Sequence, residues 1–394
     1  MAAGIGGTNC CRTRTLQLTR PSVAALPRGL AAERQSLERQ ECLLWDPQWP
    51  FERFMGLSAT AQRGIFYGGL AASLSFGYLY ATMMPGRSHE GGLSNGAPEV
   101  HSVALELKAH VARLATDIGE RRGGEGDSLT RARDYVATEL GSGAANAGPK
   151  LEHLGADGSD AANVILDLPG EVTDIVVIGA HYDSAPGTPG ANDNATGVAS
   201  GLYLAKKLGS ARYRNTLRFV FFANEEPPYF QNPGMGSLAH ARGCAERGER
   251  IIAMLALESL GYYSDEPKSQ RYPWPVGLVY PERGNFVGFV GNLGSRSLVR
   301  EAIGIFRSNA KFPSEGAALP GWIPGVGWSD HWAFWQFDYP AIMVTDTAVY
   351  RDPNYHQGSD VASNLNYEHM ARVTLGLLEV IRELAGHGLA ERKN

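Results

Sequence analysis

The stretch TLRFVFFANEE, residues 216–226, decides the fold class of this chain. Its apolar run, residues 219–223, lacks the alternation of a strand with one wet face and predicts a strand buried on both faces of a sheet. Two adjacent carboxylates, Glu225 and Glu226, follow one residue later. Burying like charges side by side costs free energy unless a cation or a proton compensates them. The stretch therefore predicts a core strand whose end carries chemistry.

Apolar runs on both sides of this strand alternate with helical patterns. Because strands that alternate with helices form layered sheets, we expect a three-layer α/β/α domain with a largely parallel mixed sheet over residues 100–387. The strands are predicted at residues 163–168, 174–179, 216–223, 251–257 and 341–345, and the main helices near residues 103–115, 128–140, 197–208, 237–247, 296–306 and 367–384.

Further segments flank this domain. Residues 1–63 are Arg-rich and predict a disordered N-terminal tail, residues 85–99 predict a linker, and residues 388–394 form a short C-terminal tail. The net charge of −5 gives no sign of a nucleic-acid partner. Cys244 is the sole cysteine of the domain, so a disulfide within the domain is excluded.

Residues 64–84, GIFYGGLAASLSFGYLYATMM, are free of charge and lie between Arg63 and Arg87. Their length matches a bilayer, which predicts a transmembrane helix or signal anchor in preference to a buried core helix. The Arg-rich tail favours a single-pass protein of the cell membrane with its domain extracytoplasmic, either periplasmic or extracellular. If translation starts at Met55, the segment becomes a signal peptide, and the domain is exported in either case.

Chemistry-bearing side chains follow one predicted strand after another. In α/β sheets the site lies past the carboxyl ends of the strands. Singly, each residue has a simple explanation, as Asp193 before a helix could be an N-cap. Together, imidazoles and carboxylates without a thiolate suit zinc or a similar divalent metal. The residues in chain order are His181, Asp183, Asp193, Glu225, Glu226, Glu258, Tyr355, His356 and Asp360.

These residues stand in the motifs H-x-D, G-A-N-D-N, N-E-E, E-S-L-G-Y, S-D-H and Y-H-x-x-x-D, in that order. The pattern resembles the zinc exopeptidase family of bacterial leucyl aminopeptidases, which also contains glutamate carboxypeptidase II and the glutaminyl cyclases. It covers roughly residues 100–387 and implies the three-layer zinc-exopeptidase fold. It also implies two Zn²⁺ per chain and a cis peptide bond after Asp193.

The resemblance implies a role for each matching residue. Asp193 would bridge the two zinc ions, and Glu225 would be the general base. Tyr355 would hydrogen-bond the tetrahedral oxyanion, and Asp183 would orient His181 by accepting a hydrogen bond from its ring nitrogen that does not face the metal. Ser329, Asp330 and His331 match a pocket-wall motif. The remaining ligands would be His181 and Glu258 on one ion, and Glu226 and His356 on the other.

Two positions depart from the family pattern. Glu258 stands where characterised relatives often carry Asp, so the ligand is one methylene longer. The loop of residues 227–235 is longer than in the familiar aminopeptidases and rich in proline and aromatic residues. We expect this loop to form a stiff wall that shapes specificity.

The predicted function is a membrane-tethered di-zinc aminopeptidase that hydrolyses N-terminal residues of peptides. One alternative is a glutaminyl-cyclase-like acyltransferase with one zinc, a branch that lacks the first histidine ligand. Another is a non-catalytic scaffold on the same fold, which the intact ligand set disfavours. A carboxypeptidase stays open, and the sequence gives neither the preferred side chain nor the oligomeric state.

Overall fold

The computed structural model describes residues 58–93, 97–124, 126–143, 148–155 and 161–386. The predicted C-terminal tail and nearly all of the N-terminal tail therefore lie outside the described residues. The chain divides into two compact units, residues 1–74 and 75–394. All the strands and the site belong to the second unit.

An eight-stranded mixed sheet forms the centre of the second unit, with the strand order β1-β2-β4-β3-β5-β8-β6-β7. β4 lies parallel to β3, β3 to β5, β5 to β8 and β6 to β7. The other pairs are antiparallel. The strands are β1 (Lys150–His153), β2 (Ala162–Leu168), β3 (Val172–His181), β4 (Asn215–Phe222), β5 (Ile251–Glu258), β6 (Val287–Gly291), β7 (Ser314–Ala318) and β8 (Ala341–Thr345).

β4 confirms the strand that the sequence predicts as buried on both faces. Phe219 and Phe221 point into the larger hydrophobic core, whereas Val220 and Phe222 point into a second core on the opposite face of the sheet. Alternate side chains of a strand point to opposite faces, so an unbroken apolar run requires helices on both sides.

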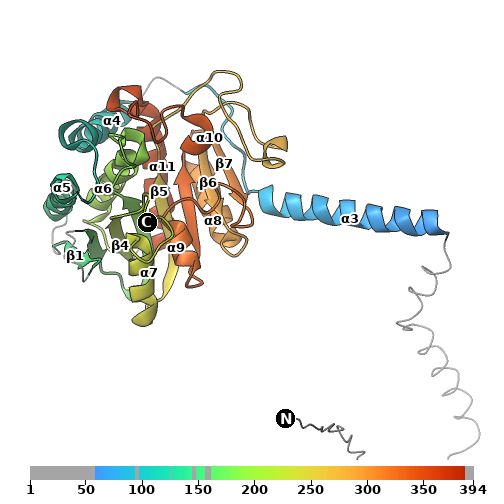
Figure 1. Ribbon diagram of the computed structural model, residues 1–394, viewed down its shortest axis with the longest axis horizontal. Coiled ribbons are helices and arrows are strands. Elements are labelled where there is room, and N and C mark those ends of the chain that lie inside the picture. The colour runs from blue at the N-terminus through green and yellow to red at the C-terminus, as the bar shows by residue number, and fades with distance from the viewer. Residues whose placement is uncertain (1–57, 94–96, 125, 144–147, 156–160, 387–394) are drawn as a thin grey trace, which may run out of the picture. The chain divides into compact units, whose positions relative to one another are not determined.

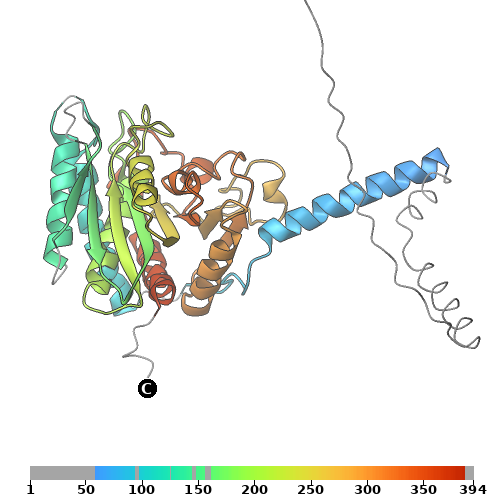
Figure 2. The same cartoon turned by 90° about the horizontal axis from the view of Figure 1, so that it is seen from below.

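Helices cover both faces of the sheet. The larger core lies under α4 (Pro98–Val111), its continuation η1 (Ala112–Ile118), α5 (Ser128–Gly143), α6 (Gly197–Leu208), α8 (Arg296–Asn309) and α11 (Tyr367–Ala385). The smaller core lies under α7 (Gly236–Glu246) and α9 (His331–Trp335). Figures 1 and 2 show the sheet between these two groups of helices. The three-layer prediction is therefore confirmed.

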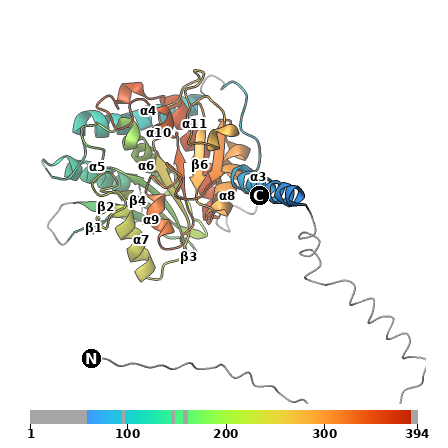
Figure 3. The same ribbon diagram turned by 45° about the vertical axis from the view of Figure 1, so that its right-hand side comes forward.

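The two ends of the sheet differ in character. β1 and β2 lie at one end, and β6 and β7 with α8 lie at the other (Figures 1 and 3). Short one-turn segments complete the connections, namely η2 (Ala191–Thr196), η3 (Val276–Leu278), α10 (Ala348–Arg351) and η4 (Ala362–Asn364). β1, β6 and β7 have four or five residues each and were not predicted from the sequence.

The segment predicted to cross a membrane forms one continuous helix, α3 (Ala59–Thr82). Within the part of the chain that the structure describes, no helix combines the length and apolar character that a bilayer span requires. Four glycines, three tyrosines and two serines within residues 64–84 dilute the hydropathy of α3. The transmembrane prediction is corrected accordingly, and the extracytoplasmic location stays a prediction.

Candidate metal centre

The strand order brings the predicted site residues together at one edge of the sheet. His181 is the last residue of β3, and Glu258 is the last residue of the neighbouring β5. Glu225 and Glu226 follow β4, which pairs with the other side of β3, with Phe222 opposite His181. Because these strands are parallel, their carboxyl ends meet and the side chains converge.

The first group of donors surrounds His181. Its Nε2 lies 3.2 Å from Asp193 Oδ1 and 3.3 Å from Glu258 Oε2. His181 and Asp193 are buried, with exposed fractions of 1% and 4%. These three residues could hold one metal ion.

The second group surrounds His356, which lies after β8. Its Nε2 lies 3.1 Å from Asp193 Oδ2 and 3.3 Å from Glu226 Oε2. These three residues form another set that could hold a metal ion. The two oxygens of Asp193 thus face different histidines, as a carboxylate shared by two sites must.

Two observations indicate that the donor set fits zinc: the kinds of ligand atom present, and buried donor atoms that lack a hydrogen-bond partner. Both ring nitrogens of His181, Asp193 Oδ1 and Glu226 Oε1 are buried and lack a hydrogen-bond partner among the described residues. Buried polar atoms are normally paired, so several orphans in one place point to a cation. Imidazole nitrogens with carboxylate oxygens are common zinc ligands. Glu225 also forms a possible set with His181 and Glu226, but its Oε2 lies farther away, 3.9 Å from His181 Nε2.

Neighbouring groups hold the ligands in place. Asp360 accepts hydrogen bonds from the backbone N–H groups of Asn192 and Asp193, at 2.8 and 3.1 Å. Asp183 Oδ1 lies 3.4 Å from His181 Nδ1, and its Oδ2 accepts a hydrogen bond from the Glu226 amide. Asp183 therefore links the ends of β3 and β4, in the position expected of a partner that orients His181.

Two hydroxyl groups orient Glu258. Ser259 Oγ donates to its Oε1 at 2.9 Å and Ser329 Oγ donates to its Oε2 at 2.8 Å. Ser329 belongs to the S-D-H motif, so one residue of this motif fixes the orientation of the Glu258 carboxylate. His331 is buried and bonded to the Val326 carbonyl at 2.8 Å, which is a structural contact.

Electrostatics in the site is unfavourable without a cation. Burial, offset only in part by His181, raises the pKa of Glu225 well above its usual value. Burial and the charge of Asp193 raise the pKa of Glu226 to about 7. Burial disfavours the charged form of His356, but Asp193 and Glu226 outweigh it and raise the pKa of His356 to about 10. Two divalent cations would relieve this repulsion.

Arg121 is a residue of the site that the sequence reasoning missed. It is fully buried, and it lies before the strands in a stretch without a recognisable motif. Its Nε donates to the Tyr182 carbonyl and its Nη2 to the Gly190 carbonyl, each at 2.7 Å. Its Nη1 donates to three more carbonyl groups, those of Leu114, Gly119 and Pro189. It thereby fixes both ends of the loop between His181 and Asp193.

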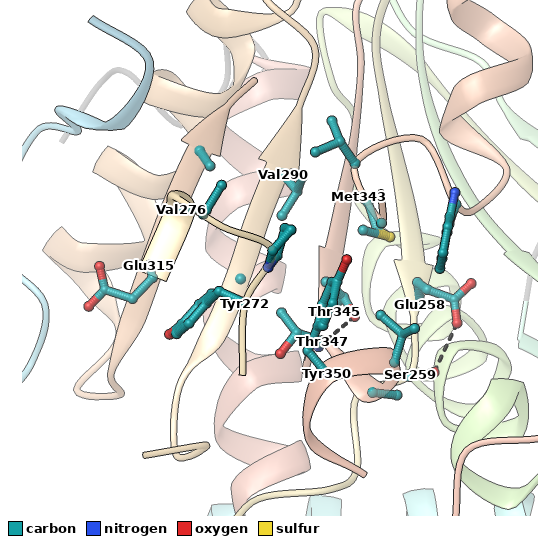
Figure 4. Close-up of a pocket in the computed structure, with 18 of the residues that line it drawn as sticks. Glu258, Ser259, Tyr272, Val276, Val290, Glu315, Met343, Thr345, Thr347 and Tyr350 are labelled. Atoms are coloured by element: carbon teal, nitrogen blue, oxygen red, sulfur yellow. Dashed lines mark hydrogen bonds between the residues drawn. The ribbon is translucent and has the colours of Figure 1, made fainter. Parts of the chain in front are cut away.

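A pocket with a volume of about 110 Å³ opens beside the donor cluster. Asp193, Glu225, Glu258 and Tyr355 line it at the metal end, and the Tyr355 ring stacks on His356 with 3.9 Å between ring centroids. Figure 4 shows Glu258 and Ser259 at one end of the pocket and Glu315 at the other. The peptide bond after Asp193 is cis, as the resemblance implies.

The proline-rich loop of residues 227–235 lies beside a different cavity. Pro227, Pro228 and Tyr229 line a second cavity, of about 100 Å³, together with Asp183 and Glu226. The lining of the larger pocket contains none of the residues 227–235. Its outer wall comes instead from the loop between β5 and β6, which contributes Tyr272, Val276 and Tyr280 to the lining.

A buried cluster of imidazoles and carboxylates at the carboxyl edge of an α/β sheet is typical of metalloenzymes. A model of the Peptidase family M28 matches residues 163–381. The chain therefore belongs to this family and is a zinc metallopeptidase.

Two relatives illustrate the breadth of the match. The chain is 36% identical to the uncharacterised protein YfbL of Escherichia coli K12 over 290 residues, which cover 71% of this chain and 88% of YfbL. It is 26% identical to leucine aminopeptidase 1 of Trichophyton equinum over 239 residues, covering 57% of this chain. The chain spans 58% of the length of that aminopeptidase.

Solved structures share the fold. The zinc aminopeptidase BSAP of Bacillus subtilis superposes with a TM-score of 0.56 at 15% identity, covering 72% of this chain and 95% of BSAP. The glutaminyl cyclase of Porphyromonas gingivalis superposes with a TM-score of 0.54 at 18% identity, covering 71% and 98%. The predicted zinc-exopeptidase fold is thus confirmed.

Proposed function

We propose that this chain is a two-zinc aminopeptidase that removes N-terminal residues from peptides. The observation that carries the proposal is the pair of donor groups that share Asp193. His181 and Glu258 face one of its oxygens, whereas Glu226 and His356 lie at the other side of the carboxylate. Asp193 would be a ligand of both ions, together with His181 and Glu258 in one site and Glu226 and His356 in the other.

The lining of the pocket favours a substrate amine over a substrate carboxylate. Its described residues include the carboxylates Asp193, Glu225 and Glu258, but no lysine or arginine. A C-terminal carboxylate has no lysine or arginine to pair with in this lining, whereas a free amino terminus needs none. An aminopeptidase therefore fits this pocket better than a carboxypeptidase.

The chain's own residues divide the chemistry between them. Zinc in the two sites would polarise the scissile carbonyl and acidify a water molecule. Glu225, buried beside the ligands, takes the proton of the attacking water and passes it to the leaving amine. Tyr355, stacked on His356, donates its hydroxyl hydrogen to the developing oxyanion.

Substitution of Glu225 by Gln tests this assignment. The variant loses the proton acceptor, so we expect kcat for aminoacyl-anilides to fall at least about 10²-fold, the lower range for a general base. Its zinc content should equal that of the wild type, measured by elemental analysis. Glu246→Gln, at an exposed position of α7, is the matched control. Full activity of the Glu225 variant would contradict the assignment.

A glutaminyl-cyclase-like acyltransferase is the second candidate, and the shared fold with the Porphyromonas enzyme is its support. That branch, by the resemblance, uses one zinc and lacks the first histidine. Here His181 is present and faces both Asp193 and Glu258. Zinc stoichiometry decides: two ions with anilide hydrolysis favour the peptidase, and one ion with cyclisation of N-terminal glutamine favours the cyclase.

A further inference from the structure

The larger pocket runs across the sheet, away from the metal ligands. Its floor consists of Met343 and Thr345 of β8, Gly288 and Val290 of β6, and Glu315, Gly316 and Ala317 of β7. These strands are consecutive neighbours in the sheet. With Glu258 of β5 at its start, the pocket crosses three strand spacings, or about 14 Å at ~4.8 Å each. Its far end therefore lies at β7, the edge strand.

The loop of residues 271–280 forms the outer wall at that far end. Val276 packs there in a small hydrophobic cluster with Ala317, Leu319 and Val326. Tyr280 donates its hydroxyl hydrogen to the Gly316 carbonyl at 2.6 Å. The tip of the loop has little packing of its own, since Trp274 is 89% exposed and Leu278 is 72% exposed. The position of the loop therefore depends on contacts with neighbouring segments of the chain.

The last turn of α3 lies behind this loop. Tyr78 donates its hydroxyl hydrogen toward the Pro275 and Val276 carbonyls, at 3.4 and 3.2 Å. Ala81 is buried, with an exposed fraction of 5%, and belongs to the same hydrophobic cluster as Val276. Met84 fills the space beside Gly316, where a Cβ would meet Met84 Cγ at 2.9 Å. These contacts join residues outside the family match to the wall of the pocket.

Arginines of α8 fix this segment in place. Arg296 donates to the Tyr80 carbonyl at 2.6 Å, and its guanidinium lies 3.8 Å from the centre of the Tyr80 ring. Arg300 donates to the Met83 carbonyl, and Arg307 donates to the Pro85 carbonyl at 3.0 Å. The last carbonyl groups of a helix lack partners within it and carry partial negative charge, so guanidinium groups stabilise this end.

The same segment covers the edge of the sheet. Ser88 Oγ accepts a hydrogen bond from the Ser314 amide of β7 at 2.9 Å. An exposed edge strand has unpaired N–H groups, and this contact satisfies one of them. Residues 78–88 are therefore built into the peptidase domain at its pocket end.

We propose that residues 78–88 set the specificity of the pocket: they hold the 271–280 loop against β7 and so fix the depth available to the N-terminal side chain of the substrate. This inference rests on the proposed aminopeptidase function. Tyr78 and Ala81 are positioning residues here, because they act through the loop and do not line the pocket.

The test compares two variants with a control from the same turn of α3. Tyr78→Phe removes the hydrogen bonds to the loop, and Ala81→Leu pushes Val276 toward the pocket. Leu79→Ala, at a side chain that is 49% exposed, is the control. For phenylalanyl-anilide we expect Tyr78→Phe to raise KM about fivefold, the effect of one lost hydrogen bond. For alanyl-anilide the KM of Tyr78→Phe should not change. The kcat of Tyr78→Phe should be unchanged with both anilides, and its zinc content should equal that of the wild type.

Hydrogen exchange gives a readout that does not need activity. In Tyr78→Phe the amides of residues 271–280 should exchange faster than in the wild type or in Leu79→Ala. Unchanged exchange, or an equal rise in KM for both anilides, would overturn the inference. If the wild type cleaves neither anilide, the proposed function fails. In that case the inference about residues 78–88 is tested by the Kd values of alanine hydroxamate and phenylalanine hydroxamate. If Tyr78→Phe changes both Kd values by the same factor, the inference is overturned.

Discussion

Glu225 and Glu226 are adjacent in sequence but differ in surroundings. The Glu226 carboxylate lies 3.3 Å from His356, and its amide is bonded to Asp183, so backbone and side chain are both fixed. Glu225 Oε2 comes no closer than 3.9 Å to His181. A fixed carboxylate suits a ligand, whereas a buried carboxylate with fewer contacts is free to exchange a proton. The pair is therefore compatible with two different roles.

Arg121 offers a prediction at the residue scale. Arg121→Met would remove a donor from five carbonyl groups, three of them in buried contacts, which should cost on the order of 3 kcal/mol in the free energy of unfolding. Arg121→Lys should recover only part of this, because an ammonium group lacks the planar fork of donors. Zinc affinity should fall in both variants, since the loop that Arg121 holds carries His181 and Asp193. Urea unfolding and competition with a chromophoric chelator measure these effects.

The neighbouring Arg122 provides the control for that experiment. Its side chain is 51% exposed and pairs with Glu120 at 3.5 Å, so Arg122→Lys should leave stability and zinc affinity unchanged. Wild-type zinc affinity in Arg121→Lys would refute the positioning role of Arg121.

Some of the donor residues could be predicted from the sequence because they follow an apolar run, whereas Asp193 and His356 lie in connecting segments between strands and helices. His181, Glu225 and Glu258 are visible in this way, and the structure brings them together. Arg121 could not be found, because it acts through contacts that only the folded chain creates. Ser329 stands in a predicted motif, but its hydrogen bond to Glu258 could not be read from the sequence. No local pattern distinguishes an arginine that will be buried from one on the surface.

At the element scale, the junction of β4 with α7 positions Glu225 and Glu226. The Gly236 amide donates to the Ala223 carbonyl at 2.9 Å, and Asn163 of β2 bonds both the Ala223 amide and the Gly236 carbonyl. A Cβ at Gly236 would lie 2.4 Å from the Ala223 carbonyl oxygen and 2.3 Å from Asn163 Oδ1. The start of α7 is therefore packed tightly against the end of β4.

Gly236→Ala should separate these two elements. We expect a loss of about 1–3 kcal/mol in the free energy of unfolding, typical of overpacking. Activity should fall further than stability alone explains, because Glu225 lies just beyond Ala223. Urea unfolding and kcat at a temperature where the variant is folded measure both effects. Gly141→Ala is the control, since its Cβ would meet Pro149 at 3.5 Å, an ordinary contact. If Gly236→Ala and Gly141→Ala have the same free energy of unfolding and the same kcat, the close packing at Gly236 does not position Glu225.

The strands that the sequence predicted are either long or, as in the five residues of β8, buried throughout. β3, β4 and β5 have eight to ten residues each and contain long apolar stretches, and helices such as α6 and α11 have clear apolar stripes. β6 (VGFVG) and β7 (SEGAA) are short and rich in small residues, so their strand character comes from pairing with β8 and with each other. α3 is helical as predicted, but its hydropathy was overestimated from the absence of charge.

At the scale of the whole molecule, several buried carboxyl groups gather at one edge of the sheet. Burial raises the pKa of Glu226, Asp330 and Asp360 to about 7 each. A carboxyl group whose pKa is raised by folding stabilises the fold below its unfolded pKa and ceases to do so as the pH rises through its folded pKa. The metal-free protein should therefore lose stability as the pH rises from about 4.5 to 7.

Zinc should reverse this dependence, because its ligands must be deprotonated to bind. Saturating zinc should raise Tm by on the order of 5–15 °C over the chelator-treated protein, as expected for binding to the native state alone. The rise should be larger at pH 8 than at pH 6, as measured by differential scanning calorimetry. His356→Gln removes one ligand and should reduce the rise at both pH values. A rise independent of pH, or one that His356→Gln leaves intact, would show that zinc stabilises the chain somewhere other than this centre.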